Sequence, residues 1–148
     1  MMVELRTILL AEDNPKDVEL TLEALSEHNL SNNVTVVRDG VETMEYLRLE
    51  GKYKLRKPGN PAVLLLDIKM PRMDGIEVLK AVRADPALKM LPIVMLTSSR
   101  EEQDVINSYK LGVNAYVVKP VDFKDFIDAV KQLGIFWAII NVVPPEVK

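Results

Sequence analysis

Residues 62–67 read Ala-Val-Leu-Leu-Leu-Asp: five apolar residues and then an acid, with no alternation of apolar and polar positions. A β-strand has this pattern when both of its faces are buried, as in a parallel sheet covered by helices. In open sheets of that kind, ligands bind beyond the carboxyl ends of the strands. The stretch therefore predicts an α/β fold, and it places Asp67 where a site would be expected.

Four more apolar runs of strand length occur along the chain, and a segment with helical spacing follows each of the five runs. Five such units favour a doubly wound parallel sheet with helices on both faces, a three-layer sandwich. The predicted strands are 7–11, 33–37, 62–66, 92–96 and 115–118. The predicted helices open at Asn14-Pro15, with an acid at Asp17, and cover about 41–49, 74–84 and 100–111 (ending at Gly112), then run from 123 toward Trp137.

Composition excludes several classes of protein. The 148 residues include no cysteine and one histidine, which argues against disulfide scaffolds and against zinc sites rich in Cys or His. The balance of 19 basic and 22 acidic residues gives −3, so no overall basic field favours nucleic acid. The basic run 52–57 is interpreted as a solvated loop. No signal peptide or membrane-length apolar stretch is found, and we expect a cytoplasmic protein without a membrane partner.

Polar residues end four of the predicted strands: Glu12-Asp13, Asp67, Thr97 and Lys119. If the strand order is 2-1-3-4-5, as in flavodoxin-like sheets, strands one and three are neighbours and their three carboxylates share one crevice. Like charges so close require a cation, and hard oxygen ligands suit Mg²⁺. An aspartate carboxylate in such a site can itself accept a phosphoryl group.

Four segments at these strand ends make the chain resemble a response-regulator receiver domain of two-component signalling, the CheY-like fold. The resemblance covers roughly residues 5–133, and it implies one receiver domain over 1–148, with a core at about 5–133 and an extended C-terminal helix and tail at 134–148. The segments are ILLAEDNP (8–15), LLLDIKMPRMDG (64–75), IVMLTSS (93–99) and AYVVKP (115–120).

The resemblance also implies roles for residues of the crevice. Asp67 would be the phosphoacceptor, and Mg²⁺ would be held by Asp13, by Asp67 and by the backbone carbonyl of Lys69, with Glu12 acting through a metal-bound water. Lys119 would contact the phosphoryl group, and the Lys119–Pro120 bond would be cis.

Two further residues match the switch positions of the family. Thr97 would turn its hydroxyl toward the phosphoryl group, and Tyr116 would follow inward. The resemblance therefore implies a response regulator that accepts phosphoryl from a partner sensor histidine kinase and changes the surface of helix four, strand five and helix five. Such a protein catalyses its own phosphorylation and slow dephosphorylation, and it is not a turnover enzyme.

Alternative functions were weighed against the same residues. A dehalogenase-like enzyme would need a second acid two residues after Asp67, where this chain has Lys69. A flavodoxin would need a phosphate loop where the chain has Glu-Asp-Asn-Pro at 12–15. A degenerate receiver that acts as a phosphorylation-independent interaction module is the remaining alternative.

The C-terminal stretch GIFWAII at 134–140 is apolar around more than one helical face. It predicts either a deeply packed helix or an exposed patch for self-association, with Ile135, Phe136 and Ile139 as the candidate dimer or partner face. Together with the loop at 50–60, it resembles the stand-alone receivers that accompany phytochromes. A phytochrome-type kinase and a homodimer are therefore the expected partners.

Overall fold

The computed structural model of the chain describes residues 7–27, 30, 33–113, 115–136 and 139. Five parallel strands form one sheet in the order β2-β1-β3-β4-β5, which confirms the predicted topology. Their bounds are β1 (Ile8–Ala11), β2 (Val34–Val37), β3 (Val63–Asp67), β4 (Ile93–Thr97) and β5 (Tyr116–Val118).

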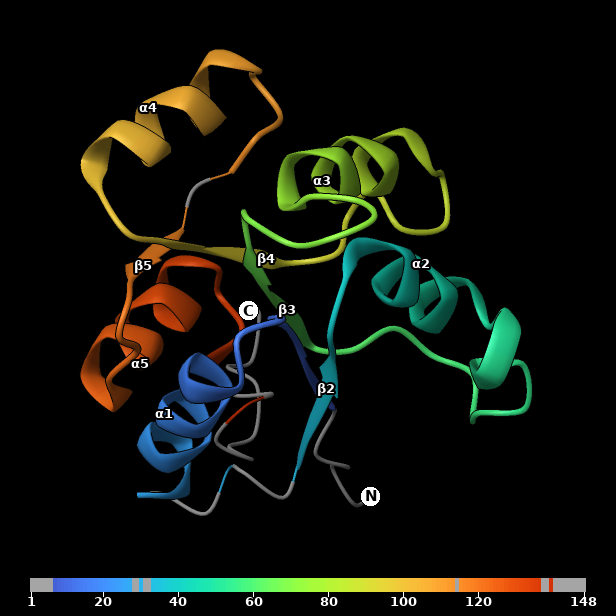
Figure 1. Ribbon diagram of the computed structural model, residues 1–148, viewed down its shortest axis with the longest axis horizontal. Helices are drawn as coiled ribbons and strands as arrows, with labels where there is room; N and C mark the ends of the chain where they lie inside the picture. Colours follow the sequence, from blue (N-terminus) through green and yellow to red (C-terminus); the bar gives the residue numbers. More distant parts are fainter. Residues whose placement is uncertain (1–6, 28–29, 31–32, 114, 137–138, 140–148) are drawn as a thin grey trace, which may run out of the picture.

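Helices cover both faces of this sheet, so the molecule has three layers (Figure 1). One core lies beneath α1 and α5, and a second lies beneath α2, α3 and α4. None of the described helices has the length and apolar character needed to cross a membrane. The helix bounds are α1 (Pro15–Ser26), α2 (Gly40–Arg48), the 3-10 helix η2 (Gly51–Tyr53), α3 (Gly75–Ala84), α4 (Arg100–Ser108) and α5 (Phe123–Gln132).

Strand β3 supplies side chains to both cores, as its sequence predicts. Val63 and Leu65 belong to the core beneath α1 and α5, while Leu64 and Leu66 belong to the other core. All four side chains are fully buried. Burial of each such side chain contributes about 1.5–3 kcal/mol, which makes β3 the centre of the sheet both in position and in energy.

Each of the five α-helices begins at a side-chain cap. A cap oxygen accepts a hydrogen bond from a backbone amide of the first turn, which otherwise lacks a partner within the helix. Removal of such a cap lowers the stability of the protein by about 1 kcal/mol. In α3 the bond is reciprocal, since Glu77 also reaches back to the amide of Asp74. The five caps are Asn14, Asp39, Asp74, Ser99 and Asp122.

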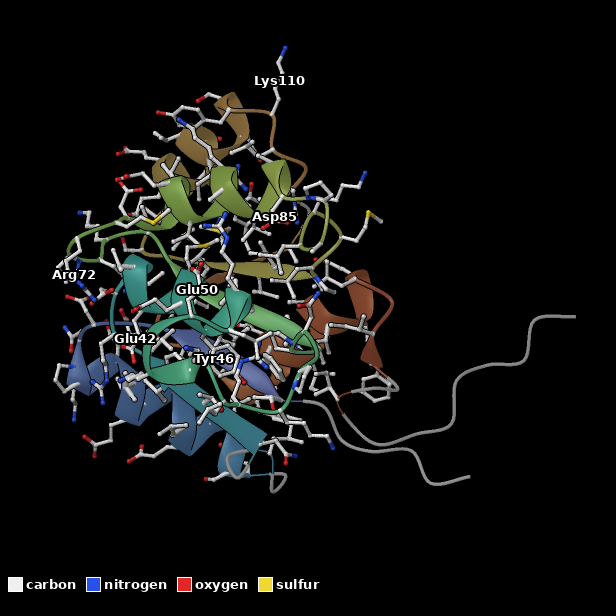
Figure 2. All side chains as sticks on the ribbon, turned by 90° about the vertical axis from the view of Figure 1, so that its right-hand side faces the viewer. Glu42, Tyr46, Glu50, Arg72, Asp85 and Lys110 are labelled. Atoms are coloured by element: carbon white, nitrogen blue, oxygen red, sulfur yellow. The ribbon has the colours of Figure 1, made fainter. Side chains whose placement is uncertain are left out.

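Helix α4 ends earlier than its sequence predicts. It stops at Ser108 instead of continuing to Leu111. Lys110, at φ 53°, takes the left-handed conformation that ends the helix, and Gly112 is also left-handed, at φ 71°. Lys110 projects into solvent (Figure 2). The chain leaves the helix here because Leu111 and Val113 turn to pack against the core beneath α2, α3 and α4.

Helix α5 also ends early, at Gln132, so the prediction of one helix running toward Trp137 is wrong. Gly134 adopts φ 72°, and the amide of Ile135 donates to the carbonyl of Val130 at 3.1 Å, which closes the helix end. After this turn Ile139 lies in the core beneath α1 and α5 and is 2% exposed. Trp137 and the predicted tail at 140–148 lie outside the described residues.

The residues of the candidate dimer face do not form an exposed patch. Ile135 and Phe136 are partly buried against the same core that contains Ile139. Within one chain these three side chains cover their own hydrophobic core. A homodimer stays a prediction, and it would have to use the parts of Ile135 and Phe136 that remain accessible.

The loop after α2 corrects the interpretation of the basic run as entirely solvated. The Arg56 guanidinium donates to the carbonyls of Tyr46, Lys57 and Gly59 at 2.7, 2.8 and 3.0 Å. It also lies 4.1 Å from the centre of the Tyr46 ring. Arg56 therefore fastens the loop to α2, whereas Lys52 and Lys54 remain exposed.

Glu42 is the other charged residue that organises this region. Its carboxylate accepts from the amide of Arg38 at 2.8 Å and from the Tyr53 hydroxyl at 2.6 Å, and it pairs with Lys52 at 2.7 Å. Glu42 and Tyr46 lie on the side of α2 that faces η2 (Figure 2). Burial raises the pKa of Glu42, but the hydrogen bonds from Lys52, Tyr53 and Arg38 outweigh burial, so that the pKa lies below its usual value.

Replacement of Glu42 should change how stability depends on pH. A carboxylate whose pKa is lowered by folding stabilises the protein above its usual pKa and loses that effect as pH falls through the lowered value. Glu42→Gln should therefore cost about 1 kcal/mol of unfolding free energy at pH 7. The difference from the wild type should shrink below about pH 4. Urea unfolding between pH 3 and 7 measures this, and the exposed Glu19→Gln is the matched control.

Gly75 is the residue whose lack of a side chain most directly permits the site loop. A Cβ at this position would lie 2.2 Å from the carbonyl oxygen of Asp67 and 2.9 Å from the Cα of Ile68. The first turn of α3 therefore packs directly on the backbone that carries Asp67.

Gly75→Ala should lower the unfolding free energy by about 1–3 kcal/mol, because backbone atoms must move to admit the methyl group. Gln132→Ala places an alanine at an exposed helical position and should change stability by less than about 0.5 kcal/mol. Chemical denaturation of both variants tests this. Equal stabilities would show that the loop after β3 can move freely.

Candidate functional site

Three carboxylates converge at the carboxyl edge of the sheet. Strands β1 and β3 are paired with Ala11 opposite Leu66, so the residues that follow, Glu12 and Asp67, are neighbours across the sheet. Glu12, Asp13 and Asp67 each offer a carboxylate oxygen, and these oxygens all lie within 4.8 Å of one another. The clustering of carboxylates predicted from the strand order is thus present in the structure.

Lys119 reaches into this cluster from the end of β5. Its ammonium nitrogen lies 3.1 Å from Asp67 Oδ1, 3.3 Å from Glu12 Oε1 and 3.2 Å from Asp17 Oδ2. The backbone amide of Lys119 donates to the carbonyl of Thr97 at 2.8 Å, which fixes the start of the side chain. The Lys119–Pro120 bond is cis, as expected.

Asp17 is a member of the site that the sequence did not predict. It lies in the first turn of α1, where an acid already has an explanation in the helix cap. Nothing in the sequence says that its carboxylate points toward Lys119. The structure therefore gives Lys119 three carboxylate partners from three different segments.

Burial alters the protonation chemistry of the site. Glu12 has no exposed surface, and burial together with the neighbouring Asp67 raises its pKa to about 8, more than Lys119 lowers it. Burial lowers the pKa of Lys119, but Asp67, Glu12 and Asp17 outweigh this effect and raise the pKa above its usual value. Lys119 thus remains protonated, next to carboxylates that repel one another.

This donor set fits a divalent metal with a preference for oxygen. The described residues at the cluster offer three carboxylates and no thiol or imidazole, a chemistry that suits Mg²⁺ or Mn²⁺ and not zinc. A cation would also keep Glu12 ionised, since it opposes the repulsion that raises the pKa of this residue. Lys69 is exposed and lines a cavity of about 440 Å³ with Ser99 and Val105, and the predicted role of its carbonyl stays a prediction.

The backbone around Asp67 is held on both sides. The amide of Ile68 donates to Asp67 Oδ1 at 2.9 Å, and the amide of Gly75 donates to the carbonyl of Ile68 at 2.7 Å. Further along the same loop, the Arg72 guanidinium makes a forked pair with Asp39, with contacts of 2.8 and 3.0 Å. The cap of α2 is thereby tied to the loop that follows Asp67.

The two predicted switch residues are hydrogen-bonded to side chains of α4. Thr97 is fully buried, and its hydroxyl accepts a hydrogen bond from the side-chain amide of Gln103 at 3.3 Å. The Tyr116 hydroxyl donates to the side-chain oxygen of Asn107. Burial, and then the negative charge of Asp104, raise the pKa of Tyr116, which keeps this hydroxyl protonated. The structure thus gathers Glu12, Asp13, Asp67 and Lys119 at one point and holds Thr97 and Tyr116 against α4.

A parallel five-stranded sheet between helices, with a cluster of carboxylates and a lysine at its carboxyl edge, is typical of one class of signalling domain. Residues 8–131 match the response regulator receiver domain family, and the chain belongs to that family.

Relatives of the chain are similar over nearly its whole length. It is 38% identical to response regulator Rcp1 of Synechocystis over 94% of this chain and 93% of the relative. It is 57% identical to the solved bacteriophytochrome response regulator AtBRR, with a TM-score of 0.88 over 93% of this chain and 99% of that one. The Mn²⁺-bound form of Rcp1 is similar with a TM-score of 0.70, at 38% identity over 95% of this chain and 99% of that one.

Removal of the Lys119 ammonium group should lower the stability of the protein, because the neighbouring carboxylates then repel one another without compensation. Lys119→Met leaves Glu12 and Asp67 without their cation, and in the presence of a chelator it should lower the unfolding free energy by about 1–3 kcal/mol. Added Mg²⁺ should recover more stability in this variant than in the wild type. Lys124→Met, an exposed lysine of α5, is the control. Equal losses in the two variants would contradict the role given to Lys119.

Proposed function

We propose that the protein is a phosphorylation-dependent response regulator, in which Asp67 accepts a phosphoryl group from a sensor histidine kinase. The observation that carries the proposal is the contact of 3.1 Å between Lys119 Nζ and Asp67 Oδ1 inside a cluster of three carboxylates. A single lysine beside one carboxylate makes a salt bridge. A lysine beside three carboxylates marks a place where a second cation and an anion can be accommodated together.

The residues of the site divide the transfer step between them. A carboxylate oxygen of Asp67 attacks phosphorus in line and forms the new O–P bond. The bond from phosphorus to the donor histidine nitrogen breaks, and that nitrogen keeps the electron pair and takes up a proton. Lys119 stays charged throughout because its pKa is raised, and its ammonium group is placed to balance the oxygens of the transferred group.

A divalent metal, Mg²⁺ in the cell, would be held by Asp13 and Asp67, with Glu12 acting through water. When bound, the metal supplies further positive charge next to the phosphoryl oxygens. Support comes from the donor chemistry of the cluster and from Rcp1, whose solved form is described as bound to Mn²⁺.

The output of the protein would be a change of surface. The acyl phosphate adds about −1.5 to −2 charges at Asp67, toward which the Thr97 hydroxyl can turn, and Tyr116 would move inward after it. The face of α4, β5 and α5 would then bind its partner differently. The protein would transfer no group to a turnover substrate and would lose its own phosphoryl group slowly by hydrolysis.

The kinase partner is proposed to be of phytochrome type. Support comes from AtBRR, a bacteriophytochrome response regulator that is 57% identical to this chain. The expected homodimer and the cytoplasmic location stay predictions.

Incubation with acetyl phosphate and Mg²⁺ tests the proposal directly. Intact-mass measurement should detect one added phosphoryl group on the wild type and none on Asp67→Asn. Asp128→Asn, which removes an exposed carboxylate from α5, should be labelled like the wild type. Labelling of Asp67→Asn would place the acceptor elsewhere. An unlabelled wild type would favour a phosphorylation-independent interaction module.

A further inference from the structure

The hydroxyls of Thr97 and Tyr116 are both held by amide side chains of α4. Gln103 Nε2 donates to Thr97 Oγ1 at 3.3 Å, and Asn107 Oδ1 accepts from the Tyr116 hydroxyl. Gln103 and Asn107 are four residues apart, so that they lie one turn from each other on the same side of the helix.

The sheet presents the two hydroxyl-bearing residues on the corresponding side. Tyr116 is paired with Met95 in the parallel register of β4 and β5, and Met95 and Thr97 are two residues apart on one strand. Side chains two residues apart share a face, so Thr97 and Tyr116 both lie on the face that α4 covers. Figure 1 shows α4 at the outer corner of this layer, beside β5.

Apart from these two hydrogen bonds, helix α4 has few contacts with the sheet. Ile106 is the one residue of the helix that is buried, at 1% exposure. The helix is nine residues long, which is too short to be stable without tertiary contacts. The two amide contacts therefore form a large part of what fixes the side of α4 that faces the sheet.

We propose that Gln103 and Asn107 form a two-point latch that holds α4 in the resting position and is released when Asp67 is phosphorylated. The inference rests on the proposed function, because release requires the phosphoryl group. Gln103 and Asn107 are positioning residues in this proposal, since they act through Thr97 and Tyr116 and do not touch Asp67.

Release follows from the geometry of the two hydroxyls. When the Thr97 side chain turns toward a phosphoryl group on Asp67, its oxygen moves away from Gln103. When the Tyr116 ring moves inward, its hydroxyl leaves Asn107. One event at Asp67 thus removes both contacts from the same side of α4, and the helix becomes free to shift or to open locally.

The latch also opposes phosphorylation, because the two hydrogen bonds stabilise the resting form. Their removal should increase the population of the form that is ready to accept a phosphoryl group. A side chain with a merely structural role would change stability without changing this population.

Hydrogen exchange of the α4 amides tests the latch in the absence of phosphorylation. Gln103→Met and Asn107→Ala remove the two contacts singly, and Asn107→Asp retains an acceptor oxygen for Tyr116. Arg100→Met is the matched control, because Arg100 is an exposed residue of α4 whose side chain makes no hydrogen bond or ion pair with the described residues. We expect exchange in α4 to rise about two- to tenfold for each lost bond, with little change in Asn107→Asp or Arg100→Met.

Two further measurements connect the latch to the switch. Beryllofluoride, a mimic of the phosphoryl group, should raise α4 exchange in the wild type toward the values of Gln103→Met and Asn107→Ala, and should change those variants little. Acetyl phosphate should label the same two variants faster than the wild type by a similar factor. Exchange in β1 and β3 should be unaltered, which confirms that the variants are folded.

Each contrary result has a distinct meaning. If Gln103→Met and Asn107→Ala exchange like the wild type, the latch is overturned whatever happens at Asp67. If beryllofluoride leaves α4 of the wild type unchanged while Asp67 is labelled, the release step is overturned and the proposed function stands. If Asp67 is not labelled in the wild type, the release step and the proposed function are both overturned.

Discussion

The repulsion among carboxylates at the end of a buried sheet is the constraint on which the rest of the site depends. Glu12, Asp13 and Asp67 lie together because the strands that carry them are adjacent and almost wholly apolar, so that the chain cannot move one acid away without unpairing a strand. Lys119 makes this arrangement tolerable by pairing with Glu12 and Asp67 at once. A group that must be compensated in this way responds strongly to any added charge, whether a metal or a phosphoryl group.

The surroundings of the site differ in how firmly they are held. On the side of α2 and α3, Gly75 packs on the backbone of Asp67 and Arg72 pairs with Asp39, so the loop after β3 has little freedom. On the side of α4, a short helix is held to the sheet by one buried isoleucine and two amide contacts. A signal that begins at Asp67 would therefore move α4 more easily than α3, since movement follows the side with fewer contacts.

Much of this arrangement was predictable from the sequence, and the remainder depends on geometry that sequence patterns do not carry. The apolar run before Asp67 predicted the sheet, and the strand order then placed Glu12, Asp13 and Asp67 together. The contacts of Asp17, Gln103 and Arg56 could not be predicted, because each depends on the direction in which one side chain leaves its backbone. The early end of α5 was missed because apolar spacing continued past Gly134, where the backbone takes a left-handed conformation.

The end of the helix before Gly134 has a consequence for how the chain can be divided. The family match ends at residue 131, yet Ile139 lies in the core beneath α1 and α5, with Ile135 and Phe136 packed beside it. A boundary drawn at the end of α5 would retain every residue of the acidic site and remove part of the cover of one hydrophobic layer. A fragment made in this way would be less stable, because that hydrophobic layer would be exposed. Its loss of activity would then be mistaken for a defect of the acidic site.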